Sequence, residues 1–140
     1  MTHANRIPAH IAHITMRWGD MDALGHLNNT YYFRYMEQAR LDWLDSHGCG
    51  INPQATGPVI AHISCDFKKE IVYPAVVEVH TFVTHIGRSS MKIDHEFRVQ
   101  GDTETLYATG HAVLVWVDYV NGGSVPVPEA MRAAIPGAAT

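Results

Sequence analysis

The spacing of apolar residues divides the chain into one helix-like segment and several strand-like segments. Between Thr30 and His47, apolar residues recur every three or four positions, as they do on one face of an α-helix. The members of this stripe are Tyr32, Met36, Ala39 and Trp43. Phe33, Leu41 and Leu44 widen the apolar surface. The pattern therefore predicts a long helix that is mostly buried.

Both ends of this predicted helix carry residues that are typical of helix ends. Asn28 or Asn29 is the expected N-cap, because a short polar side chain can accept a hydrogen bond from a free backbone N–H. Gly48 stands where a left-handed residue commonly follows the last turn.

Around the helix, the apolar residues alternate with polar ones, which indicates strands. The expected strands cover residues 7–18, 62–67, 77–84, 91–99 and 106–117, with a turn at Gly101-Asp102 and a short helix over 129–135. We expect the last four strands to be consecutive antiparallel neighbours, because short turns join them. The prediction is one α+β domain, residues 1–140, in which an antiparallel sheet wraps a single long helix. This architecture is called the hotdog fold.

Composition narrows the classes of function. The chain has 140 residues, enough for one core without disulfides or metals. Only 17% of residues are charged, below the usual quarter, which hints that another subunit covers part of the surface. The net charge of −4 provides no general attraction for nucleic acid.

Other signals are absent from the sequence. The first residues contain no apolar signal segment, no run approaches the length of a membrane span, and Cys49 and Cys65 form no CxxC motif. We therefore expect a cytoplasmic protein with reduced thiols and no membrane partner. The ten histidines match no zinc spacing, so we expect no metal, and no serine-hydrolase, NTPase or dinucleotide motif occurs.

The segment 18–32 carries the candidate chemistry, because two carboxylates, Asp20 and Asp22, come shortly before the helix. A helix start offers unpaired backbone N–H groups and partial positive charge. Asp22 could serve there as a nucleophile or general base, while the N–H of Asn29 polarises an ester or thioester carbonyl. Asp20 could equally form the turn. His26 is either a hydrogen-bonded turn residue or a partner of Asp22.

Two basic spots stand at expected strand ends. One contains Lys68 and Lys69, and the other contains Arg88, Ser89 and Ser90. Each is ordinary for an exposed turn, but jointly they could hold the phosphates of a nucleotide-bearing carrier.

The motif Asp22-Ala-Leu-Gly-His-Leu-Asn-Asn-Thr-Tyr-Tyr32, followed by Glu37-Gln-Ala-Arg40, resembles acyl-CoA thioesterases of the 4-hydroxybenzoyl-CoA thioesterase type, within the hotdog superfamily. The resemblance extends to 67–74, 87–90 and 108–118. It implies that Asp22 is the catalytic carboxylate and that the Asn29 N–H binds the thioester carbonyl. It also implies homodimers or homotetramers with acyl-CoA bound at the dimer interface. We expect no cofactor. We expect Gly25, Asn28 and Tyr31 to contribute to substrate binding.

The resulting prediction is an acyl-CoA thioesterase that releases a free acid and coenzyme A. Whether Asp22 attacks the carbonyl or activates water stays open, and so does the acyl group. One alternative is a hotdog hydratase or dehydratase acting on an enoyl thioester, which would need His26 paired with Asp22. The other is a non-catalytic domain that binds acyl thioesters.

Overall fold

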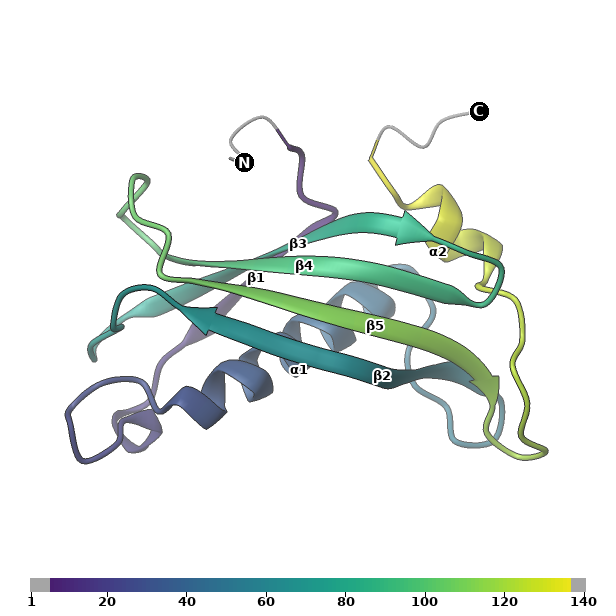
Figure 1. Ribbon diagram of the computed structural model, residues 1–140, viewed down its shortest axis with the longest axis horizontal. Coiled ribbons are helices and arrows are strands. Elements are labelled where there is room, and N and C mark those ends of the chain that lie inside the picture. Colours follow the sequence, from purple (N-terminus) through teal and green to yellow (C-terminus); the bar gives the residue numbers. More distant parts are fainter. Residues whose placement is uncertain (1–5, 137–140) are drawn as a thin grey trace.

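Five antiparallel strands form one sheet, and a long helix lies against one of its faces (Figure 1). The computed structural model describes residues 6–136. The elements in chain order are β1 (His10–Thr15), the 3-10 turn η1 (Trp18–Asp20), α1 (Asn29–Ser46), β2 (Thr56–Phe67), β3 (Val76–Ile86), β4 (Ser90–Val99), β5 (Ala108–Asp118) and α2 (Glu129–Ala133). This arrangement confirms the α+β hotdog fold predicted from the sequence.

Helix α1 begins and ends within one residue of the predicted bounds, Thr30 and His47. The side-chain Oδ1 of Asn28 accepts a hydrogen bond from the Thr30 N–H at 3.0 Å, which makes Asn28 the N-cap. Gly48 follows the last turn with a φ of +70°, a conformation that glycine adopts without steric strain. All four residues of the predicted apolar stripe are buried. Leu41 differs from the expectation: it is 36% exposed, because it faces a surface cavity rather than the sheet.

The strand order differs from the predicted run of consecutive neighbours. The sheet order is β1-β3-β4-β5-β2, so β2 pairs with β5 and not with β3. Residues 68–75 connect β2 to β3, and they pass the start of α1, where the Leu27 N–H donates to the Ile71 carbonyl at 2.8 Å. This connection carries the chain from one side of the sheet to the other. As a result β2 is an edge strand, and its Phe67 is 48% exposed.

The core lies between α1 and the sheet in two clusters. One surrounds the first half of α1 and contains Tyr32, Met36 and Phe97, and the other surrounds Trp43 and Trp116. Helix and sheet approach closely at Gly110, where a Cβ atom would collide with the sulfur of Met36. Glycine at this strand position therefore lets α1 pack tightly against β5.

A histidine on β4, His95, is fully buried in this core. Its Nδ1 lies 3.1 Å from the Thr81 hydroxyl, and its Nε2 has no hydrogen-bond partner among residues 6–136. Burial lowers the pKa of His95 from 6.5 to about 3, and the charges of Arg40 and His111 act in the same direction. The folded protein therefore keeps this ring neutral, whereas the unfolded chain protonates it below pH 6.5.

We expect His95 to make the protein less stable as the pH falls from 6.5 toward 3, the window in which only the unfolded state binds this proton. Its contribution is roughly 1.4 kcal/mol of unfolding free energy per pH unit. Urea unfolding at pH 7, 6 and 5 measures the slope. A His95→Gln variant should show a shallower slope than the wild type, and identical slopes would contradict this assignment.

Candidate active site

A tight loop places Asp22 beside the start of α1. The Asn28 N–H donates to the Asp20 carbonyl at 2.9 Å, and the Asp22 N–H donates to the His26 carbonyl at 2.9 Å. The loop turns at Gly25, which has a φ of +78°, and its N–H donates to the Asp22 carbonyl at 3.0 Å. Asp22 is thereby held opposite the residues that lead directly into the helix.

The Asp22 carboxylate is fixed through one of its two oxygens. Its Oδ1 accepts a hydrogen bond from the Leu24 N–H at 2.9 Å, which orients the side chain within the loop. Within the described part of the chain, its Oδ2 accepts no hydrogen bond and joins no ion pair. The side chain is half-buried. Asp22 therefore presents one oriented and unoccupied carboxylate oxygen, as a nucleophile or general base requires.

Asp20 has a different environment, because it is only 3% exposed. Its Oδ2 accepts hydrogen bonds from the Tyr35 hydroxyl at 2.6 Å and from the Arg17 N–H at 3.2 Å. Burial alone would raise the pKa of Asp20, but these hydrogen bonds and the Arg17 charge outweigh it and lower the pKa. Asp20 therefore fastens η1 to α1, which agrees with the turn-forming role that the sequence left open.

We expect Asp20→Asn to lower the free energy of unfolding by about 1–3 kcal/mol, because an amide accepts weaker hydrogen bonds from Tyr35 and Arg17 and loses the ion pair. Urea denaturation measures the change. Asp22→Asn is the matched comparison, and its stability should stay within about 0.5 kcal/mol of the wild type, since Asp22 is tied by one local bond. Equal losses in the two variants would remove the distinction between them.

The first residue of α1, Asn29, offers an unused backbone donor. The capping oxygen of Asn28 is occupied by the N–H and the hydroxyl of Thr30, at 3.0 and 2.9 Å. The Asn29 N–H has no acceptor among residues 6–136. Asn29 itself is exposed. An incoming carbonyl oxygen could therefore take this hydrogen bond together with the positive end of the helix dipole.

The other residues of the motif differ in how they relate to Asp22. His26 contacts Asp22 through its backbone carbonyl, and its side chain forms no hydrogen bond with the rest of the described chain. The His26–Asp22 side-chain pair that a hydratase would need is therefore not formed. Tyr31 is half-buried and packs against the core around the first half of α1.

One chain does not bring the two basic spots together. Lys68 directly follows β2, beside Ala108 at the start of β5. The turn that contains Arg88, Ser89 and Ser90 instead lies beside Val115, seven residues further along β5. That separation is about 23 Å. Lys68 lies at the end of the sheet that is near the start of α1, because the connection 68–75 is joined to that helix start by the hydrogen bond from the Leu27 N–H to the Ile71 carbonyl. The joint phosphate site expected from sequence cannot form within one subunit.

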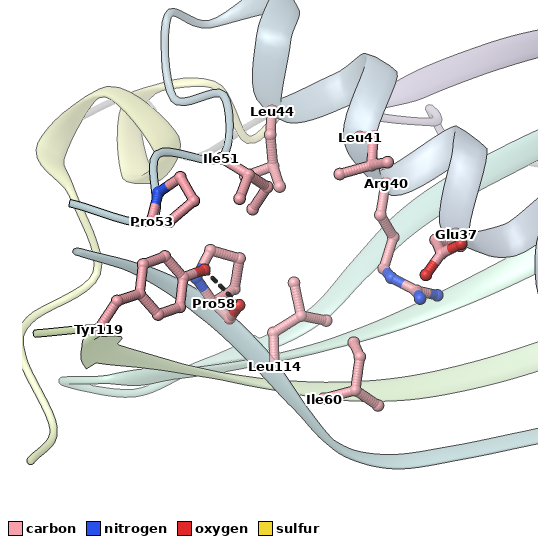
Figure 2. Close-up of a pocket in the computed structure, with 10 residues that line it drawn as sticks. All are labelled: Glu37, Arg40, Leu41, Leu44, Ile51, Pro53, Pro58, Ile60, Leu114 and Tyr119. Atoms are coloured by element: carbon pink, nitrogen blue, oxygen red, sulfur yellow. Dashed lines mark hydrogen bonds between the residues drawn. The ribbon is translucent and has the colours of Figure 1, made fainter. Parts of the chain in front are cut away.

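A cavity of about 450 Å³ opens between α1, β2 and β5 (Figure 2). Its lining is mostly apolar and consists of Glu37, Arg40, Leu41, Leu44, Ile51, Pro53, Pro58, Ile60, Leu114 and Tyr119. It begins at Glu37, eight residues or about 12 Å along α1 from Asn29. Its size lies within the range of small-molecule pockets. The sequence contained no signal for this cavity, because its walls come from segments far apart in the chain.

Two features are absent from residues 6–136. The structure contains no helix there that is long and apolar enough to cross a membrane. Among the same residues, no group of three or more His, Cys, Asp or Glu side chains could hold a metal ion. Cys49 and Cys65 are both free thiols.

Comparison with known proteins gives consistent matches. The family model of the thioesterase-like superfamily matches residues 16–135. A structure reported as a proposed thioesterase from Pseudomonas aeruginosa is 41% identical, covers 91% of this chain and 98% of its own, and superposes with a TM-score of 0.88. A proposed acyl-CoA thioesterase from Xanthomonas campestris is 35% identical, with coverage of 84% and 99% and a TM-score of 0.73. A gentisyl-coenzyme A thioesterase is 25% identical, with coverage of 89% and 98% and a TM-score of 0.77.

Proposed function

The chain belongs to the thioesterase-like superfamily, and from that premise we propose that it is an acyl-CoA thioesterase with Asp22 and the Asn29 N–H as its catalytic groups. Similar structures reported as thioesterases, at 41% and 35% identity, support thioester hydrolysis. One observation carries the assignment of the site: an unoccupied carboxylate oxygen on Asp22 lies on a short loop that leads into an unoccupied helix-start N–H.

These two groups can divide the reaction between them. The thioester carbonyl oxygen would accept a hydrogen bond from the Asn29 N–H, which stabilises the negative charge that develops on this oxygen. Asp22 would either attack the carbonyl carbon, giving an anhydride that water then hydrolyses, or take a proton from a water molecule that attacks instead. In both routes the carbon–sulfur bond breaks, and coenzyme A leaves as a thiolate that is then protonated.

We also propose that the working unit is a homodimer joined through β2. This strand is at the edge of the sheet and exposes the apolar side chains of Val59, Ile60 and Phe67. Unpaired strand edges are ready to pair with another chain. Such a dimer would agree with the low content of charged residues, and two dimers could form the predicted tetramer. The location of the protein in the cytoplasm stays a prediction from the sequence.

A two-fold, antiparallel pairing of β2 strands would also bring the two basic spots closer together, with each spot supplied by a different subunit. The turn 88–90 lies toward the Thr56 end of β2, whereas Lys68 follows the opposite end. In the dimer, Lys68 would therefore approach Arg88 of the partner subunit across three strand spacings, about 14 Å. We place the coenzyme A phosphates between them and the acyl group in the cavity along α1.

Hydrolysis of a panel of acyl-CoAs tests the proposed function. The panel contains linear acyl groups of two to sixteen carbons together with benzoyl and hydroxybenzoyl groups, and released coenzyme A is measured with a thiol reagent. Thiol release from at least one member with saturation kinetics is the expected result. If no member is hydrolysed although acyl-CoA protects the protein against thermal unfolding, the alternative of a non-catalytic binding domain gains instead.

A further inference from the structure

A buried arginine inside the cavity has no partner in the described chain. Arg40 is only 7% exposed, and it forms no hydrogen bond or ion pair with any other residue in 6–136. Its Nη1 is completely enclosed and unsatisfied. Figure 2 shows its guanidinium extending from α1 into the cavity toward Glu37, with Ile60 and Leu114 below it. A buried guanidinium without acceptors is strongly unfavourable, so this group calls for an acceptor that the described chain does not supply.

Neighbouring side chains leave most of its donors free. Glu37 also lines the cavity, but its carboxylate contacts Arg34 at 3.4 Å and forms no ion pair with Arg40. His95 lies close enough for the Arg40 charge to affect it, yet a neutral imidazole can accept only one hydrogen bond. A guanidinium carries five N–H donors in a planar fork.

The position of Arg40 fits the remote end of an acyl group. Arg40 follows Asn29 by eleven residues, which is roughly 16 Å along the helix axis. Its side chain leans back toward the helix start, as helical side chains do (Figure 2). Because an extended arginine side chain spans about 6 Å, the guanidinium lies roughly 10 Å from Asn29 along the axis, and an extended ten-carbon acyl chain spans roughly 11 Å. A thioester held at Asn29 would therefore bring the end of such a chain to the guanidinium.

We propose that Arg40 selects acyl groups that carry a hydrogen-bond-accepting oxygen, a hydroxyl or a carboxylate, at the end remote from the thioester. This inference rests on the proposed thioesterase function and adds a substrate class to it. The apolar walls of the cavity hold the carbon chain, and Arg40 supplies the polar anchor.

Three CoA thioesters of equal length test the role of Arg40: decanoyl-CoA, 10-hydroxydecanoyl-CoA and sebacoyl-CoA. They differ only at the tenth carbon, far enough from the thioester to leave its intrinsic reactivity unchanged. The wild type should hydrolyse at least one oxygen-bearing substrate with kcat/KM about 10- to 100-fold above that for decanoyl-CoA. Preference for sebacoyl-CoA identifies a carboxylate as the partner, and preference for 10-hydroxydecanoyl-CoA identifies a hydroxyl.

Variants distinguish a role of Arg40 in substrate selection from a role in stabilising the fold. Arg40→Met should abolish the preference, so that kcat/KM for the oxygen-bearing substrates falls to the value for decanoyl-CoA. Arg40→Lys keeps the charge but loses the fork, so it should retain only part of the preference. The matched control is Arg34→Met, an exposed arginine on the same helix, which should leave the preference unchanged.

Three outcomes would overturn the inference: equal wild-type kcat/KM values for all three substrates, an unchanged preference in Arg40→Met, or a parallel loss on all three substrates. Comparison of the wild-type kcat/KM values for the three substrates tests the inference even if Arg40→Met does not fold. Failure to hydrolyse any acyl-CoA would contradict the proposed function itself and is distinguishable from these outcomes.

Discussion

Replacing Asp22 by asparagine is expected to lower kcat by about 10²–10⁴-fold, the range for removal of a group that transfers protons in the transition state. The amide is similar in size to the carboxylate and can still accept the hydrogen bond from the Leu24 N–H, so the loop should keep its conformation. The charge and basicity that either catalytic route requires are lost. The effect should therefore appear in kcat, with little change in KM.

Steady-state kinetics on the substrate preferred in the panel measures this loss, and urea unfolding shows that the variant remains folded. Asp20→Asn serves as the opposite control, because it should lose stability through the bonds to Tyr35 and Arg17. A folded Asp22→Asn variant with wild-type kcat would disprove the catalytic assignment. Solvent ¹⁸O that enters the Asp22 side chain during a single turnover would identify the covalent route, and its exclusion would identify activation of water.

Replacing Asn29 by proline is expected to lower kcat by about 10²–10³-fold, the usual effect of removing one oxyanion donor. Proline removes the backbone N–H without disturbing the helix, because the first helical position favours proline. The preceding residue must be extended, and Asn28 already is, with φ −59° and ψ 132°. The change therefore removes the proposed donor alone.

Asn29→Ala is the matched control, because alanine keeps the N–H and changes only the exposed side chain. Its kcat should stay within a few-fold of the wild type. The two variants, compared on one substrate with their thermal unfolding temperatures, separate the backbone from the side chain. If Asn29→Ala loses as much activity as Asn29→Pro, the side chain and not the N–H is responsible.

The fold was predictable where local spacing determines it. The stripe from Tyr32 to Trp43 fixed the buried face of α1, and Asn28 and Gly48 fixed its ends, because these signals act over a few residues. The position of β2 was not predictable in this way. Its pairing with β5 depends on contacts across the sheet and on the path of 68–75 around the helix start, neither of which alternation records.

The candidate site was likewise predictable only where its residues are close in sequence. Asp22 and Asn29 are close in sequence, so a motif could place them together, and the structure adds which of their atoms are free. Lys68 and Arg88 are far apart in sequence, and their separation of about 23 Å within one chain could not be predicted, because it depends on the strand register. Arg40 was part of the motif, but its burial without a partner arises from packing between α1 and β2.

The most direct test of the proposed mechanism is the rate of thiol release from one acyl-CoA, measured side by side for the wild type, Asp22→Asn and Asn29→Pro. We expect saturable turnover by the wild type and rates at least about 100-fold lower for both variants, with unchanged thermal unfolding. Wild-type rates in both folded variants, or no thiol release by the wild type from any member of the panel, would contradict the assignment of this site as a thioesterase centre.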